Sequence, residues 1–208
     1  MAIGAGSRDR QGMVTVNFWF ELASPYAYLS AMRIGEMARA ARVEVAWHPF
    51  LLGPIFADRG WADSPFVLFP ERGRYMWRDL EREAPRYGIP FARPSQFPLH
   101  SVLAARVALV AFAAGFGEAF VRAAYTAHFT RDANLARPEV IDSILAGVGA
   151  DGPRTRERAA SGQVKAALRT KVETARAAGI FGAPSFVVGD ELFWGNDRLE
   201  QAIAWARA

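Results

Sequence analysis

The sequence predicts an α/β fold in which both ends of the chain build one sheet and an all-helical domain is inserted between its halves. A strand–helix–strand pattern starts near residue 14 and contains VTVNFWFELASPYAYLS. Residues 56–178 show helical periodicity and no convincing strand, and a strand–turn–strand–helix pattern ends the chain. With 208 residues, 51% of them hydrophobic, the chain is long enough for one domain that carries a sizeable insertion.

The first half of the sheet is expected near the N-terminus. Residues 14–20 alternate between strongly apolar and partly polar side chains, which is the period of a strand. Pro25 suits the first position of a helix and Ser24 suits its N-cap, so we expect a helix that runs to about Ala41. The run VEVAW at residues 43–47 predicts a second strand. Two strands joined by a helix are expected to be parallel, with a right-handed crossover.

The middle of the chain is expected to be helical throughout. Periodic apolar residues, separated by Gly and Pro, predict helices over Glu71–Tyr87, Ser101–Ala114, Glu118–Phe129, Pro138–Gly147 and Pro153–Ala178.

The end of the chain returns to strands. SFVV at residues 185–188, then Gly-Asp, then ELFW at residues 191–194 predict a hairpin. Residues 196–207 are expected to form a short final helix with one apolar side.

These elements predict the domain boundaries. Residues 13–55 and 179–208 are expected to form the sheet domain, and residues 56–178 the helical insertion. Residues 1–12, MAIGAGSRDRQG, lack the apolar core of a signal peptide, and we expect them to be a disordered leader.

Charge and hydropathy argue against several classes of protein. The net charge is +4, and the arginines are interspersed with acidic residues, as in RGRYMWRDLEREAPR, so we expect no nucleic-acid binding. The most apolar helical run, Val107–Phe116, is shorter than the roughly 20 residues that span a bilayer. We therefore expect no membrane insertion and a cytoplasmic protein.

The chain contains no cysteine, so it forms no disulfide and has no thiol nucleophile of its own. His48, His100 and His128 show none of the spacings typical of metal ligands, and we expect no metal.

A series of local motifs resembles one family. SPYAYL follows the first expected strand, HPFLLGPIF the second, RGRYMWRDLER lies in the insertion, GAPSFVVG precedes the hairpin and FWGNDRLE precedes the last helix. Their order resembles the 2-hydroxychromene-2-carboxylate isomerases, which are relatives of kappa-class glutathione transferases in the DsbA-like group. The resemblance covers nearly all of residues 14–207.

The resemblance implies a thioredoxin-like βαβ…ββα sheet with an all-helical insertion. It also implies a glutathione-dependent isomerase and a homodimer. In this family glutathione is a cofactor that adds reversibly to an unsaturated aromatic-derived acid and is not consumed.

Ser24 is the expected catalytic residue. SPYA stands where a redox thioredoxin has Cys-x-x-Cys, with Ser24 in the first position and Ala27 in the second. Disulfide exchange needs a thiolate, so this chain cannot perform it alone. A helix N-terminus favours an anion, and a serine hydroxyl there can donate a hydrogen bond to the thiolate of glutathione. The alternative is that Ser24 only caps the helix.

Other residues are expected to hold glutathione. Pro184 stands where the family has a cis-proline, and the Ala183 backbone would then pair with the cysteinyl part of the peptide. Asn196 and Asp197 would bind the γ-glutamyl end, or would simply cap the last helix. Arg72, where relatives usually have lysine, could pair with the glycine carboxylate, or could be a solvated arginine.

The resemblance also implies a pocket for a second substrate. Tyr26, Trp61 and His100 are its candidate residues. Ala62, Val67 and His100 depart from the polar amides that are common in relatives.

Two other functions stay open at this stage. One is a kappa-like glutathione transferase, which would release a conjugate. The other is a non-catalytic thioredoxin-like binding protein.

Overall fold

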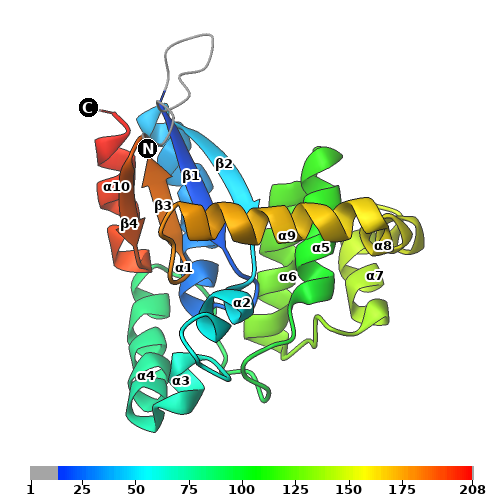
Figure 1. Ribbon diagram of the computed structural model, residues 1–208, viewed down its shortest axis with the longest axis horizontal. Coiled ribbons are helices and arrows are strands. Elements are labelled where there is room, and N and C mark those ends of the chain that lie inside the picture. The colour runs from blue at the N-terminus through cyan, green and yellow to red at the C-terminus, as the bar shows by residue number, and fades with distance from the viewer. Residues whose placement is uncertain (1–13, 208) are drawn as a thin grey trace.

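The computed structural model describes residues 14–207, so the expected disordered leader lies outside the described residues. A four-stranded sheet has the order β2-β1-β3-β4. β1 (Thr15–Phe20) is parallel to β2 (Glu44–Pro49) and antiparallel to β3 (Ser185–Val188), which forms a hairpin with β4 (Glu191–Trp194). The predicted parallel pair and the predicted hairpin are both confirmed, and both ends of the chain meet in one sheet (Figure 1).

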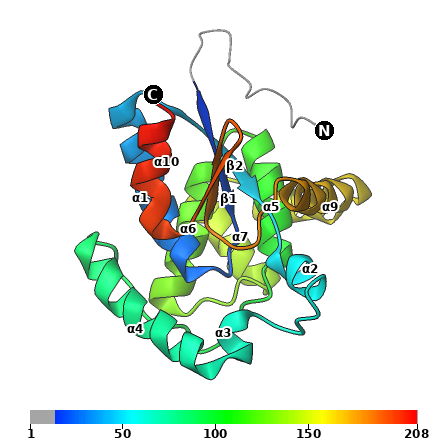
Figure 2. The same ribbon diagram turned by 60° about the vertical axis from the view of Figure 1, so that its left-hand side comes forward.

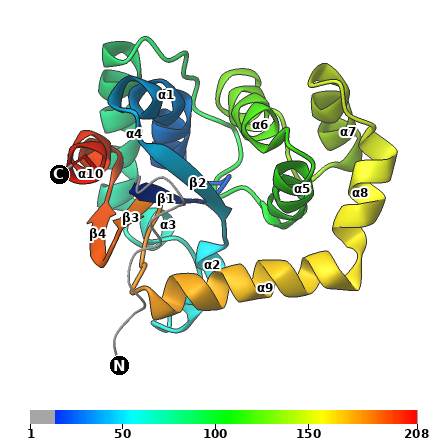
Figure 3. The same ribbon diagram turned by 90° about the horizontal axis from the view of Figure 1, so that it is seen from above.

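Different helices cover the two faces of the sheet. α1 (Pro25–Ala41) and α10 (Leu199–Trp205) pack on one face, and α9 (Gly162–Ala177) runs across the other (Figure 3). The alternation in β1 explains this division. Phe18 belongs to the large core beneath α1, whereas Trp19 packs in a smaller cluster with residues of α9.

The remaining helices extend from the sheet at two places. Figures 1 and 2 show α3 and α4 below the end of β1, where α1 begins, and Figures 1 and 3 show α5 to α8 in a layer beside the β2 edge. The bounds are α2 Leu52–Ala57, α3 Pro65–Leu68, α4 Pro70–Arg86, α5 Val102–Ala113, α6 Gly117–Arg131, α7 Pro138–Gly147 and α8 Gly152–Ala160. No helix within residues 14–207 is both long and apolar enough to cross a membrane.

The prediction of a single helix over Pro153–Ala178 is wrong. α8 ends at Ala160, and Ser161 has extended backbone angles, φ −61° and ψ 153°. The Ser161 hydroxyl accepts a hydrogen bond from the Val164 N–H and thereby caps α9. The chain turns at this point, and α9 can then run back across the sheet.

Other differences from the predicted elements are short helices. α2 and α3 were not predicted, and the expected domain boundary at residue 55 falls inside α2. The predicted final helix begins with a 3-10 turn, Asn196–Arg198, which precedes α10.

The strand order brings distant segments together at the end of β1. Because β1 and β3 are antiparallel neighbours, with Trp19 opposite Ser185, the end of β1 lies beside the start of β3. The turn into α1 therefore meets the segment that precedes Ser185.

Candidate active site

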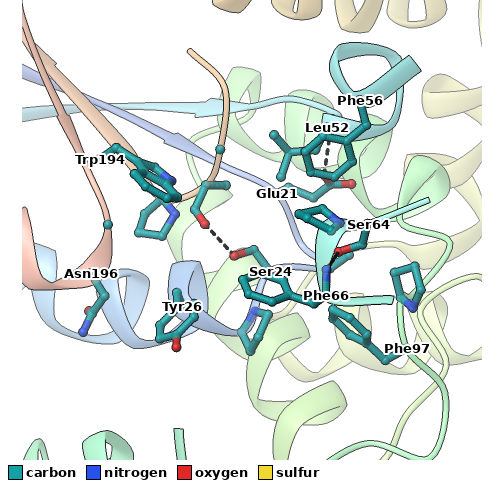
Figure 4. Close-up of a pocket in the computed structure, with 18 of the residues that line it drawn as sticks. Glu21, Ser24, Tyr26, Leu52, Phe56, Ser64, Phe66, Phe97, Trp194 and Asn196 are labelled. Carbon is teal, nitrogen blue, oxygen red and sulfur yellow. Dashed lines mark hydrogen bonds between the residues drawn. The ribbon is translucent and has the colours of Figure 1, made fainter. Parts of the chain in front are cut away.

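A cavity of about 1210 Å³ opens at this end of the sheet (Figure 4). Its walls come from the β1–α1 turn, the segment from the end of β2 to α3, α4, the loop before α5 and the segments on either side of the hairpin. Binding sites for small molecules commonly measure roughly 300–1,000 Å³. The cavity therefore has room for a short peptide together with a second small molecule.

Ser24 lies in this cavity at the N-terminus of α1. Its Oγ accepts a hydrogen bond from the Ala27 N–H at 3.2 Å, and its hydroxyl donates to the Ala183 carbonyl oxygen at 2.8 Å. The predicted N-cap is confirmed. Because Pro25 has no N–H and the Tyr26 N–H makes no hydrogen bond within residues 14–207, this helix end keeps an unused donor.

The bond between Ala183 and Pro184 is cis, as predicted, and both residues line the cavity with Ser24. The Pro184 carbonyl accepts a hydrogen bond from the Gly195 N–H at 3.0 Å. The Ala183 N–H makes no hydrogen bond to another atom of residues 14–207. It is therefore free to pair with an extended peptide.

Asn196 is buried and lines the cavity near α1 (Figure 4). Its Oδ1 accepts hydrogen bonds from the Ser30 hydroxyl at 3.0 Å and from the Arg33 guanidinium at 3.1 Å. No side chain caps the 3-10 turn or α10, so the interpretation of Asn196 and Asp197 as caps is wrong. The Asn196 NH2 group donates to no other atom within residues 14–207, and it can serve a ligand.

Asp197 and Arg72 are charged residues at the rim of the cavity. The Asp197 side chain is 68% exposed and lies 3.3 Å from Arg198. Arg72, in the first turn of α4, is exposed, and its guanidinium lies 4.5 Å from the centre of the Phe69 ring. Within residues 14–207 Arg72 has no acidic partner, which leaves its charge available to a carboxylate.

The candidate residues for a second ligand also line the cavity. The Tyr26 hydroxyl donates to Asp79 Oδ2 at 2.9 Å, and its pKa is raised, first by burial and then by that carboxylate. The Trp61 ring lies 5.8 Å from the ring of Phe56. His100 is exposed at the edge. The hydrogen bond of its hydroxyl thus fixes the Tyr26 side chain, and mainly its ring is available to contact a ligand.

Ala62 and Val67, the positions expected to depart from relatives, lie differently with respect to the cavity. Ala62 is exposed and lines the cavity, whereas Val67 is 40% exposed and lies outside the lining. Ala62 can therefore contact a ligand directly.

Of the ionisable residues of the cavity that were not predicted from the sequence, Glu21 is buried. It follows β1 directly, it is 8% exposed, and its carboxylate accepts hydrogen bonds from the Leu52 N–H and the Ser101 hydroxyl, each at 2.7 Å. Burial raises its pKa above the ordinary 4.5. An acidic residue directly after an apolar strand and three positions before Ser24 was the available signal.

Among residues 14–207, no group of three or more His, Cys, Asp or Glu side chains is arranged to hold a metal ion. The polar groups of the cavity are instead hydroxyls, amides, single carboxylates and arginines.

Comparisons with known proteins agree on the fold. The family model described as a DSBA-like thioredoxin domain matches residues 15–203. The structure of a 2-hydroxychromene-2-carboxylate isomerase superposes with a TM-score of 0.83 at 22% identity and covers 92% of this chain and 93% of the other. A cytosolic disulfide reductase, DsbM from Pseudomonas aeruginosa, superposes with a TM-score of 0.65 at 17% identity over 92% and 95% of the two chains.

Two sequence relatives carry names of enzymes. A 2-hydroxychromene-2-carboxylate isomerase from Sphingobium xenophagum is 32% identical over 192 residues, which are 89% of this chain and 94% of that protein. Glutathione S-transferase kappa 1 from Homo sapiens is 23% identical over 200 residues, 89% and 88% of the two chains.

Proposed function

Because this chain belongs to the DsbA-like thioredoxin family and is related to the 2-hydroxychromene-2-carboxylate isomerases, we propose that it is a glutathione-dependent isomerase of an unsaturated aromatic-derived acid. The observation that carries this proposal is the position of Ser24. It caps α1 inside a large cavity, beside a cis-proline, in a chain without cysteine. Such a site can bind a thiol but cannot supply one.

Bound glutathione would supply a thiolate that adds reversibly to the double bond of the substrate. Ser24 and the free Tyr26 N–H would stabilise the negative charge at the N-terminus of α1. If they lower a thiol pKa from about 8.5 to about 6.5, the thiolate fraction at pH 7 rises from roughly 3% to roughly 75%. That change corresponds to about 2.7 kcal/mol, which a hydrogen bond and a helix end can provide together.

The rest of the peptide would be held by groups that line the same cavity. The Ala183 N–H, next to Pro184, would pair with the backbone of the cysteinyl residue. The Asn196 NH2 group would donate a hydrogen bond to the α-carboxylate of the γ-glutamyl residue. The Asp197 carboxylate would accept a hydrogen bond from the α-ammonium group of the same residue. Arg72 would attract the glycine carboxylate.

The second substrate would lie against the aromatic wall of the cavity. The rings of Tyr26 and Trp61 offer apolar faces on which an aromatic acid can stack. His100, at the open edge, could exchange a proton or attract the acid. We also propose that the protein acts in the cytoplasm as a homodimer, as the family resemblance implies.

The 23% sequence identity to glutathione S-transferase kappa 1 supports a second candidate function, a kappa-like transferase. Both enzymes need the same activated thiolate, and they differ in the fate of the product. A third candidate, a non-catalytic thioredoxin-like binding protein, would bind glutathione without turnover.

A turnover screen over unsaturated aromatic acids separates the three candidates. An isomerase converts the acid only when glutathione is present, and the amount of free glutathione after the reaction equals the amount before. A transferase depletes it in proportion to product. A binding protein gives neither result, although glutathione raises its melting temperature. If millimolar glutathione does not raise the melting temperature, the protein does not bind glutathione, and all three candidate functions are wrong.

A further inference from the structure

Glu21 is a buried carboxyl group within the walls of the cavity. It belongs to the turn that carries Ser24, and the Ser24 N–H donates to the Glu21 carbonyl oxygen at 2.9 Å. The backbone of this turn thus fixes the two residues relative to each other. In Figure 4 the Glu21 side chain points away from Ser24, toward Leu52 and Phe56. It therefore faces the part of the cavity lined by Leu52 and Phe56, and the Phe56 ring lies 5.8 Å from Trp61, one of the residues proposed to hold the second substrate.

The Glu21 carboxylate accepts its hydrogen bonds from neutral groups. Its hydrogen bonds come from the Leu52 N–H at the start of α2 and from the Ser101 hydroxyl before α5, and within residues 14–207 it forms no ion pair. From α6, Tyr125 donates its hydroxyl to the Glu21 carbonyl oxygen at 2.8 Å. Asp63 and His100 are ionisable residues of the same lining. With no cation beside it, a buried carboxyl group keeps its proton more readily than one in water.

The pKa of Glu21 is shifted in the direction that these contacts predict. Burial raises it above 4.5, and the hydrogen bonds from Ser101 and Leu52 lower it by less. Such a group gains and loses a proton closer to neutral pH, which suits acid–base catalysis.

Three residues already proposed for the site, Tyr26, Ser24 and His100, are less suited to proton transfer with a substrate. The Tyr26 hydroxyl donates its hydrogen bond to Asp79, and the raised Tyr26 pKa keeps this hydroxyl protonated. The Ser24 hydroxyl is engaged with Ala183 and Ala27. His100 is exposed to solvent at the edge.

We propose that Glu21 is a catalytic acid that gives a proton to the carbonyl oxygen of the second substrate and takes it back later in the same turnover. This role rests on the proposed function, and it requires that the double bond of the substrate be conjugated to that carbonyl group. A thiolate adds only to a double bond polarised in this way.

The proton and the electrons balance over one turnover. When a nucleophile adds to the far carbon, the π pair of the carbon–carbon double bond moves toward the carbonyl carbon, and the carbonyl π pair forms a new O–H bond. The O–H bond of Glu21 breaks and leaves its pair on the carboxylate. When the double bond returns, the carboxylate removes the same proton and the nucleophile leaves with its own pair. No oxidant or reductant is needed.

The first test measures the proton on Glu21 directly, without turnover. Carbon-13 NMR of the glutamate carboxyl groups, followed against pH in the free protein, should show one group that titrates above 4.5. Its signal should be absent from Glu21→Gln and should move to higher pH in Ser101→Ala, because that hydroxyl lowers the pKa. A Glu21 signal that titrates at or below 4.5 overturns the proposal.

The second test compares turnover of the parent, Glu21→Gln, Ser101→Ala and the matched control Glu36→Gln. Glu36 is exposed on α1 and lies outside the cavity lining. Glu21→Gln should lower kcat by about 100-fold or more, the typical contribution of a general acid. The fall of parent kcat at high pH should disappear in Glu21→Gln, persist in Glu36→Gln and move to higher pH in Ser101→Ala.

Different outcomes identify different errors. If the parent enzyme turns over with glutathione and Glu21→Gln matches its kcat and pH profile, Glu21 is not the acid. If Ser101→Ala loses as much activity as Glu21→Gln without a displaced pH profile, Glu21 only positions α2 and α5. If the parent shows no glutathione-dependent turnover, the proposed function itself fails, and the acid role fails with it.

Discussion

The Ser24 hydroxyl donates a 2.8 Å hydrogen bond to the carbonyl oxygen of Ala183, a residue 159 positions away in the sequence. A serine hydroxyl has one proton, so Ser24 cannot keep this bond and also donate to a thiolate. Its oxygen already accepts from the Ala27 N–H. The proposed function therefore requires the hydroxyl to rotate from Ala183 toward the sulfur when glutathione binds.

Ser24→Ala and Ser24→Gly should separate capping from thiolate binding. Ser24→Ala loses the cap, which costs about 1 kcal/mol of unfolding free energy, whereas glycine is a tolerable N-cap. Both variants lose the hydroxyl, so in both the pKa of bound glutathione should rise by about one unit or more. Thiolate absorbance against pH and turnover at neutral pH measure this effect. Parent-like titration and turnover of Ser24→Gly would show that Ser24 is only a cap.

Asn196→Asp should weaken glutathione binding without loss of stability. Aspartate keeps an oxygen that accepts from Ser30 and Arg33, but it replaces the free NH2 group with a second oxygen. That oxygen repels the α-carboxylate of glutathione, and we expect at least a tenfold rise in Kd by calorimetry. Asn196→Ala is the control, because it loses the buried acceptor and should cost about 1–3 kcal/mol in chemical denaturation. Unchanged affinity in Asn196→Asp would assign Asn196 a structural role alone.

Arg72→Gln should raise the Kd for glutathione by no more than about fivefold. The guanidinium is exposed, and exposed ion pairs typically contribute less than about 1 kcal/mol. The matched control is Arg74→Gln, because Arg74 lies on the same helix, pairs with Glu71 at 3.1 Å and does not line the cavity. Calorimetry at low salt should show a raised Kd for glutathione in Arg72→Gln and an unchanged Kd in Arg74→Gln. Equal affinities of both variants would mean that Arg72 is a solvated arginine.

His48 should make the protein less stable in mild acid. His48 Nε2 lies 2.9 Å from Asn17 Oδ1, and Nδ1 lies 2.8 Å from Lys171 Nζ. Burial and, to a smaller extent, the positive charge of Lys171 lower the His48 pKa from 6.5 to about 4. Between these values the unfolded chain binds a proton that the folded protein does not, so unfolding free energy falls as pH falls from 6.5 to 4. The loss is at most about 3 kcal/mol.

Urea denaturation at several pH values tests this prediction. His48→Gln should flatten the dependence between pH 6.5 and 4. Lys171→Gln should reduce it partly, because it removes the charge but leaves His48 buried. A parent-like slope in His48→Gln would assign the acid sensitivity to other groups.

The sequence predicted the sheet well because its signals are local. Alternation in residues 14–20, the Ser24–Pro25 helix start and the Gly-Asp turn each depend on neighbouring residues, and the structure follows them. The break at Ser161 was missed because Ser161 follows a helical pattern that continues on both sides. The change of direction is marked by the extended backbone of Ser161 and by its capping bond to Val164.

The site was harder to predict, because its contacts join distant segments. Ser24 and Pro184 were identified by motif, and the structure brings both to one cavity. Asn196 was expected to bind glutathione or to cap the last helix, and the motif could not decide between the two because a one-dimensional pattern does not reveal Arg33 and Ser30 as its partners. Glu21 was missed because its burial depends on α2 and α5, which come from elsewhere in the chain.

The position of β3 next to β1 has a consequence for synthesis of the protein. β1 emerges from the ribosome before the helical insertion, but its neighbour β3 is made only after the whole insertion, as is Pro184. Chains usually begin to fold from the N-terminal side while they are being made. A nascent or prematurely terminated chain that stops before residue 184 can hold Ser24 and the start of α1, but it lacks the opposite wall. The cavity is therefore completed only after the helical insertion has been made, and a chain that stops before residue 184 cannot form the whole cavity.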